Sequence, residues 1–205
     1  MRLVSFLPSR SSRWPALAAA LLCAVLGAPA ALATDSPPPA SGAVAAPQPT
    51  DQFLDMLASR PGPHAAADLR TRIAALWGLS GSDTADLLSA RAATLLRAGD
   101  AGTAFDLLDA AVTVAPDWAE GRRRRAMMRL MRGDVDRARL DLEAAVRSEP
   151  RQFPAMITLA MLAEQRGDRV AALAWARRAA AVDPSDAALA EHIRVMAIEV
   201  EGREI

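Results

Sequence analysis

Three segments of this chain follow one pattern: GDAGTAFDLLDAAVTVAP at residues 99–116, GDVDRARLDLEAAVRSEP at 133–150 and GDRVAALAWARRAAAVDP at 167–184. The interval from Gly99 to Gly133 equals that from Gly133 to Gly167, with no insertion. The same shift aligns three columns of alanine, namely Ala92, Ala126 and Ala160; Ala104, Ala138 and Ala172; and Ala111, Ala145 and Ala179. Alanine is common throughout the chain, so the Gly, Asp and Pro columns carry the stronger signal. The chain therefore contains an internal repeat.

Each column of the repeat has a structural reason. Gly followed by Asp ends one helix and begins the next, because Gly adopts the left-handed C-terminal conformation and Asp caps an N-terminus. Alanine lets two helices approach closely, and Pro stops the second helix. Each copy is therefore predicted to be a helical hairpin, with helix pairs at 84–98 and 101–115, at 118–132 and 135–148, and at 152–166 and 169–182. Such hairpins stack into a right-handed solenoid, since none buries its apolar face alone.

Residues 83–184 resemble the tetratricopeptide-repeat family in the length of their period and in their Gly, Asp, Ala and Pro columns. The stretches SGSDTADLLSARA, VAPDWAE and SEPRQF are similar to those of exported repeat proteins from alphaproteobacteria. The resemblance implies an all-α superhelix, a concave peptide-binding face and no enzymatic activity. The chain departs from the family pattern where large aromatics are expected, at Leu88, Arg122 and Met156 and at Leu95, Arg129 and Ala163.

The middle copy is unusually rich in arginine, with Arg122 to Arg125 in succession. Four successive helical residues point to different sides, so the run does not form one basic patch. Arg125 stands where the family pattern has leucine. We therefore expect Arg125 and Arg129 to be partly buried and paired with carboxylates, because arginine is the preferred cation of half-buried ion pairs. The candidate partners are Asp106, Asp109 and Asp141.

Residues 1–33 have the pattern of a secretory signal peptide. A start with three arginines precedes an apolar run between Pro15 and Pro29, and Ala31-Leu32-Ala33 forms a small-residue cleavage site. The alternative is a permanent membrane anchor, but the run is shorter than the roughly 20 residues that a span needs. The sequence therefore predicts export to the periplasm, with no stable membrane insertion after cleavage.

The remaining chain divides by composition. Residues 34–50 are rich in Ala, Pro and Ser and are predicted to be a disordered linker. Residues 51–82 are predicted to form N-terminal capping helices, at 51–60 and 65–79. Three repeats follow at 83–116, 117–150 and 151–184, and residues 185–205 are predicted to be a C-terminal capping helix. The expected fold class is thus all-α, a tetratricopeptide-type right-handed helical solenoid of three hairpins flanked by capping helices.

The composition argues against several functions. Every basic residue is arginine, so a P-loop lysine and a Schiff-base lysine are excluded. The single cysteine, Cys23, lies in the predicted signal peptide. After cleavage the chain has 21 arginines and 24 acidic residues, so its net charge is slightly negative and does not favour nucleic-acid binding. His64 and His192 are far apart in the predicted solenoid, which disfavours a metal site. We find no catalytic motif and expect neither a catalytic residue nor a cofactor.

The family resemblance implies that a ligand lies against the first helix of each hairpin. Carried onto this chain, the predicted peptide-binding groove is Leu96, Arg97, Arg123, Arg124, Met127, Met131, Thr158, Met161 and Gln165. Exposed methionines form an adaptable surface, whereas a methionine between helices is ordinary core, and for Met131 both alternatives stay open. The family's carboxylate clamp needs Asn and Lys, and this sequence has Ser89, Ala93 and Thr158 at the matching sites.

Two functional hypotheses follow. The first is a non-enzymatic periplasmic interaction module that holds a peptide segment of a cell-envelope partner in its concave groove. The alternative is a self-assembling structural protein that forms a homo-oligomer through its end helices, 51–60 and 185–201. Light scattering would distinguish a monomer from a stable oligomer.

Overall fold

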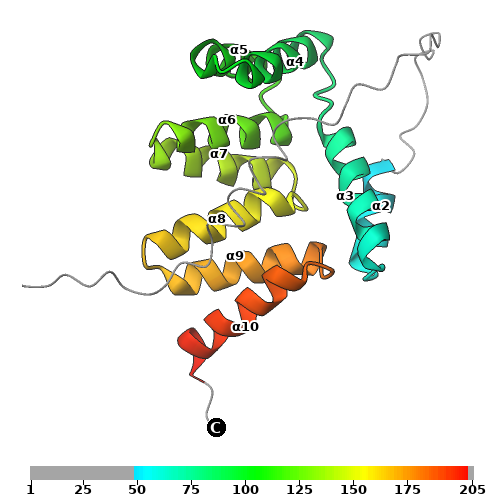
Figure 1. The fold of residues 1–205 in the computed structure, drawn as a ribbon, viewed down its shortest axis with the longest axis vertical. Coiled ribbons are helices and arrows are strands. Elements are labelled where there is room, and N and C mark those ends of the chain that lie inside the picture. Colours follow the sequence, from blue (N-terminus) through cyan, green and yellow to red (C-terminus); the bar gives the residue numbers. More distant parts are fainter. Residues whose placement is uncertain (1–48, 203–205) are drawn as a thin grey trace, which may run out of the picture. The chain divides into compact units, whose positions relative to one another are not determined.

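The computed structural model describes residues 49–202 (Figure 1). The predicted signal peptide and nearly all of the predicted linker lie outside these residues. All regular structure between 49 and 202 is helical: α2 (Pro49–Ala58), α3 (Pro63–Trp77), α4 (Asp83–Arg97), α5 (Ala101–Val114), α6 (Ala119–Met131), α7 (Val135–Ser148), α8 (Phe153–Gln165), α9 (Arg169–Val182) and α10 (Ala187–Glu201). The helices from α4 to α9 closely match the predicted ranges, and the all-α fold class is confirmed.

The repeated Gly-Asp pairs form the hairpin turns as predicted. Gly99, Gly133 and Gly167 have positive φ angles of 87°, 77° and 78°. The following aspartates, Asp100, Asp134 and Asp168, each accept a hydrogen bond from the backbone N–H three residues later, at 3.0, 3.3 and 3.0 Å. Left-handed glycine followed by an N-cap aspartate is thus the device that reverses the chain in every copy.

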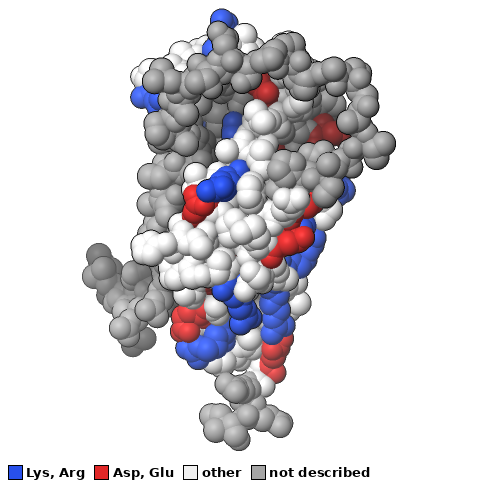
Figure 2. Space-filling view, turned by 90° about the vertical axis from the view of Figure 1, so that its right-hand side faces the viewer, with Lys and Arg blue, Asp and Glu red and all other residues white. Residues whose placement is uncertain are grey.

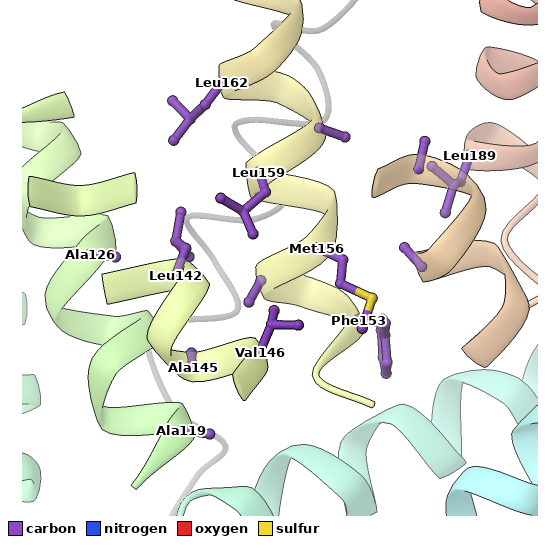
Figure 3. Close-up of a cluster of buried hydrophobic side chains, with 14 of the residues drawn as sticks. Ala119, Ala126, Leu142, Ala145, Val146, Phe153, Met156, Leu159, Leu162 and Leu189 are labelled. Carbon is purple, nitrogen blue, oxygen red and sulfur yellow. The ribbon is translucent and has the colours of Figure 1, made fainter. Parts of the chain in front are cut away.

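The hairpins α4–α5, α6–α7 and α8–α9 pack one after another, and α10 packs on α9 (Figure 1). The alanine columns lie where helices meet: Ala104, Ala138, Ala172, Ala111, Ala145 and Ala179 are all fully buried. Larger side chains fill the space between the second and third hairpins, where Leu142 and Val146 of α7 lie toward Leu159 of α8 in a shared core (Figure 3). The close approach allowed by alanine therefore sets the spacing of the stack.

The pair α2–α3 takes a different place from the predicted N-terminal cap. It does not stack on α4; it packs against the later hairpins, and α2 lies beside α9 (Figure 1). Leu54, Leu57 and Ile73 are fully buried in the same apolar core as α8 and α9. The first hairpin, in contrast, has its buried apolar residues in two smaller clusters separate from this core.

Three contacts hold α2–α3 along the connections between hairpins. The Trp118 Nε1 atom donates a hydrogen bond of 2.7 Å to the Trp77 carbonyl at the α5–α6 connection. The Arg151 Nη2 atom lies 2.8 Å from Asp55 Oδ1 at the next connection. Arg70 donates to Asp183 at the third connection, with Nε 2.6 Å from Oδ2. On the face shown in Figure 2, acidic and basic side chains accordingly lie beside one another rather than in separate fields.

Gly121 makes the hydrogen bond from Trp118 to the Trp77 carbonyl sterically possible. A Cβ atom at this position would lie 2.1 Å from Trp118 Cε3, closer than real Cβ contacts allow. The indole ring rests directly on the glycine and is only 7% exposed. Gly121 therefore permits Trp118 to lie flat on α6 and reach the end of α3.

We expect Gly121→Ala to destabilise the protein by about 1–3 kcal/mol, because the added methyl group must displace a buried ring. Thermal unfolding followed by circular dichroism measures the effect. Gly102→Ala is the matched control: it also lies in the first turn of a helix, and its Cβ would meet only Asp100 Oδ1 at 3.6 Å, an ordinary contact. Equal melting temperatures for the two variants would contradict the proposed role of Gly121.

Candidate functional site

The first helices of the hairpins present a surface in repeat register. Because α6 begins at Ala119 and α8 at Phe153, one repeat period later, equivalent positions of successive repeats lie at the same level on these helices. Met127 and Met161 form one such pair, and Arg97, Met131 and Gln165 form one such column. We call these five residues and Leu96 the distal stripe, because they lie in the later turns of α4, α6 and α8.

The distal stripe is open to solvent in its last column. Met131 is 54% exposed, and Arg97 and Gln165 are exposed as well. Met127 and Met161 are half-buried, and Leu96 packs partly against the core of the first hairpin. The alternative of Met131 as an ordinary core residue is therefore wrong. A mobile thioether at a surface of this kind adapts its shape to a neighbouring apolar group.

The expectation that Arg123 and Thr158 lie open in the groove is wrong. Both are only 4% exposed. Thr158 Oγ1 donates to the Pro154 carbonyl of its own helix at 3.0 Å, and the Arg123 guanidinium is occupied by Glu120. Arg124 is partly exposed but is committed to contacts within the chain. Arg123 and Thr158 therefore belong to the interior of the protein, and the guanidinium of the partly exposed Arg124 is occupied by Glu120 and Ser89.

Glu120 is the centre of a buried polar network. Its carboxylate accepts two hydrogen bonds of 2.8 Å from Arg123 and one of 2.9 Å from Arg124 Nε. Gln152 Nε2, just before α8, donates a fourth bond of 3.0 Å. Arg124 also donates from Nη1 to Ser89 Oγ on α4 at 3.0 Å. The network thus joins the first helices of all three hairpins.

The two arginines keep this buried carboxylate charged. Burial alone would raise the pKa of Glu120, but the charges and hydrogen bonds of Arg123 and Arg124 outweigh it and lower the pKa to about 2. Burial would likewise lower the pKa of Arg123, and Glu120 reverses the effect and raises it. Such mutual compensation is what makes a buried ion pair tolerable. The arrangement holds helices together and offers no group for proton transfer at neutral pH.

A second ion cluster confirms the prediction for Arg125 and Arg129. Their side chains are 14% and 17% exposed, and both donate to Asp141, with Arg125 Nη2 2.7 Å and Arg129 Nη1 2.8 Å from its oxygens. Arg125 Nη1 also donates to Asp109 at 2.7 Å. Asp106 makes no ion pair within the described part of the chain. The hydrogen bonds that Arg125 donates to Asp141 raise the pKa of Arg125 and outweigh its burial, which alone would lower that pKa. The cluster connects α5, α6 and α7.

Neither histidine takes part in a metal site within residues 49–202, where His, Cys, Asp and Glu form no group suited to a metal ion. His64 is exposed, and His192 Nε2 lies 3.2 Å from Glu164 Oε2. In the same residues no helix is both long and apolar enough to cross a membrane.

Comparison with known proteins agrees with this architecture. No family model matches the chain. A TPR repeat-containing protein of Rhizobium etli is 29% identical over 153 residues, which is 74% of each chain. The first TPR of Spaghetti (RPAP3), bound to the HSP90 peptide SRMEEVD, superposes with a TM-score of 0.53 at 15% identity, over 59% of this chain and 96% of that one. MamA gives a TM-score of 0.47 at 15% identity, over 68% and 81%.

The fold is therefore an all-α helical solenoid, the class of protein that the hairpins and their stacking define. Its resemblance to the tetratricopeptide-repeat family is confirmed by the sequence relative and by the structural neighbour. Of the residues predicted for the groove, those of the distal stripe include the exposed ones, Arg97, Met131 and Gln165.

The pairing of Glu120 with Arg123 and Arg124 could have been predicted from their spacing in the sequence. In AEGRRRR, Glu120 precedes Arg123 by three residues and Arg124 by four, the separations at which helical side chains meet. Nothing in the sequence, however, indicates the burial of this group or the contribution of Gln152 from another hairpin.

The low pKa of Glu120 predicts acid sensitivity. Its contribution to stability is complete above the ordinary pKa of 4.5 and is lost as the pH falls toward about 2. The difference corresponds to roughly 3 kcal/mol. Urea unfolding between pH 7 and pH 2.5 measures it, and Glu120→Gln should flatten the dependence on pH. The variant should also be less stable at pH 7, by about 3–5 kcal/mol, because Arg123 stays buried without its carboxylate.

Glu191→Gln provides the control for this experiment. Glu191 pairs with Arg194 at the surface, with side chains 60% and 59% exposed, and exposed pairs contribute little. We expect its unfolding free energy to follow that of the parent protein at every pH. If Glu120→Gln did the same, the buried carboxylate would not be a source of stability.

Proposed function

We propose that this protein is a non-enzymatic periplasmic interaction module that binds a peptide segment of a cell-envelope partner along the distal stripe. The observation that carries the proposal is the row of Arg97, Met131 and Gln165, which repeats at one level of α4, α6 and α8 and stays exposed. A solenoid with such a row offers a continuous surface, and binding of an extended or helical segment is the use that suits it.

The chemistry of the stripe indicates the kind of segment. The methionines supply apolar contact that adapts to the partner. Arg97 supplies the charge: its Nε donates to the Ala93 carbonyl at 3.3 Å and its Nη2 to Thr94 Oγ1 at 3.2 Å, and no carboxylate pairs with it within the described residues. A segment with apolar anchors and a carboxylate near Arg97 fits this surface. We therefore expect Arg97, rather than Arg123 or Arg124, to contact a carboxylate of the partner.

The structural neighbour supports a binding role, since the first TPR of Spaghetti (RPAP3) is bound to a peptide. This chain would hold a peptide differently. Ser89 and Thr158, at two of the positions of the family's carboxylate clamp, are each only 4% exposed. Recognition would therefore depend on the distal stripe rather than on a clamp at these positions.

Self-assembly through the end helices is the alternative, and one observation favours it. Val195 and Ile198 on α10 are 40% and 43% exposed. On α2, Leu54 and Leu57 are fully buried within the chain, and Met56 is 54% exposed. An oligomer through the end helices would therefore use Val195 and Ile198 of α10 together with Met56 of α2. Multi-angle light scattering distinguishes the hypotheses: a monomer supports the interaction module, and an oligomer that persists on dilution supports self-assembly.

The proposed location predicts a mature N-terminus at Thr34, because Ala31-Leu32-Ala33 precedes it as a signal-peptidase site. Expression in a Gram-negative host, release by osmotic shock and N-terminal sequencing test this. A chain found only in the membrane fraction, with residues 1–33 still attached, would instead indicate an anchor.

The proposed groove predicts which substitutions weaken partner binding. A partner captured by cross-linking in the envelope fraction would be purified and its binding measured by surface plasmon resonance. We expect Met131→Glu to raise the Kd at least ~10-fold through faster dissociation, since it places a charge among apolar contacts. Arg97→Glu should mainly slow association and reduce its salt dependence.

Leu140→Glu is the matched control, because Leu140 on α7 is 55% exposed, almost the same as Met131, and lies on a second helix. It should leave binding unchanged. If Met131→Glu and Arg97→Glu bind normally while Ile198→Glu abolishes binding, the distal stripe is not the site and α10 takes its place.

A further inference from the structure

A second surface lies apart from the distal stripe, beside the connection between α3 and α4. Here a cleft of about 460 Å³ is lined by residues 76, 77, 79–82, 114–120, 148 and 149. This volume falls within the range of about 300–1,000 Å³ that is usual for ligand-binding clefts. The cleft contains none of the residues of the distal stripe, so a ligand there would be independent of the proposed groove.

One wall of the cleft is apolar and partly open. Leu79 is 63% and Val114 is 48% exposed, and they lie near the indole rings of Trp77 and Trp118. Trp118 is held by its hydrogen bond to the Trp77 carbonyl and by Gly121 beneath it. An accessible apolar wall next to fixed aromatic rings is a surface that gains free energy when a partner covers it.

The charge of the lining has one sign. Asp117, Glu120 and Glu149 contribute carboxylates, and none of the lining residues is basic. Glu120 is neutralised by Arg123 and Arg124. Asp117 makes no hydrogen bond or ion pair within the described part of the chain, and the Glu149 carboxylate accepts only the backbone N–H of Arg151, at 2.9 Å. Neither carboxylate therefore makes an ion pair within residues 49–202, and the arginine beside them, Arg122, donates from Nε to the Pro116 carbonyl at 2.6 Å.

We propose that this cleft binds a basic and apolar segment of a partner protein, in which an arginine or lysine side chain neighbours a large apolar one. The cation would lie between Asp117 and Glu149, and the apolar side chain would cover Leu79 and Val114. The ligand preference is thus opposite to that of the distal stripe, whose exposed charge is Arg97.

Isothermal titration calorimetry of the full-length chain with short blocked peptides tests the proposal. The probes are N-acetylated, C-amidated Leu-Arg-Leu, Leu-Gln-Leu and Leu-Glu-Leu. We expect Leu-Arg-Leu to bind, Leu-Gln-Leu to bind roughly 10-fold more weakly, and Leu-Glu-Leu to show no binding, because like charges repel across an interface. Asp117→Lys should abolish the preference for arginine, and Leu79→Ser should weaken both peptides that bind.

Two control variants keep the test specific. Asp136→Lys changes an exposed acid on α7 that has no ion pair within the described residues, and it should leave all three affinities unchanged. Met131→Glu alters the distal stripe and should also leave peptide binding at the cleft unchanged. The proposal for the cleft can therefore be rejected independently of the proposal for the distal stripe. The proposal is overturned if Leu-Arg-Leu does not bind at millimolar concentration, if Leu-Glu-Leu binds equally well, or if Asp136→Lys weakens binding as much as Asp117→Lys.

Discussion

The buried carboxylate of Glu120 is the interaction on which the arrangement of this solenoid depends. It receives hydrogen bonds from Arg123 and Arg124 on its own helix and from Gln152 at the start of the next hairpin. Arg124 in turn donates a hydrogen bond to Ser89 on α4. Its guanidinium also lies 5.4 Å from the centre of the Trp118 ring, and Trp118 donates a hydrogen bond to the Trp77 carbonyl of α3. One ionised group thereby connects four helices, and its two arginines are what make its burial tolerable.

This network explains why the basic run of the middle repeat is not a binding patch. The last three arginines of the run each form an ion pair within the chain: Arg123 and Arg124 with Glu120, and Arg125 with Asp141 and Asp109. Guanidinium groups engaged in this way can exchange an internal partner for a ligand only by leaving a carboxylate unpaired. In the proposed function, contacts with a partner would then fall to the methionines and to Arg97, which pairs with no carboxylate within the described residues.

The local structure could be predicted from the sequence because its causes are local. The Gly-Asp turns, the alanine columns and the half-buried Arg125 and Arg129 all follow from residues whose partners lie within a repeat or at a fixed shift of it. The place of α2–α3 could not be predicted. It depends on contacts between residues 41 and 113 positions apart, such as Trp77 with Trp118 and Arg70 with Asp183, for which no periodic pattern exists.

The same long-range packing decides which part of the repeat surface remains available. Along α6 the exposure rises from 6% at Glu120 and 4% at Arg123 to 54% at Met131. On α6 and α8 the early turns are buried, and Trp77 at the end of α3 contacts both helices there through Trp118 and Phe153. On α4, in contrast, Leu87 in the second turn is 54% exposed. Positions that the repeat pattern treats as equivalent are therefore unequal in this chain: Thr158 is 4% exposed, whereas Ala90, two repeats earlier, is exposed. In the proposed function, binding specificity would then be set jointly by the repeats, which supply the row of side chains, and by the segment outside the repeats that lies against the first turns of α6 and α8.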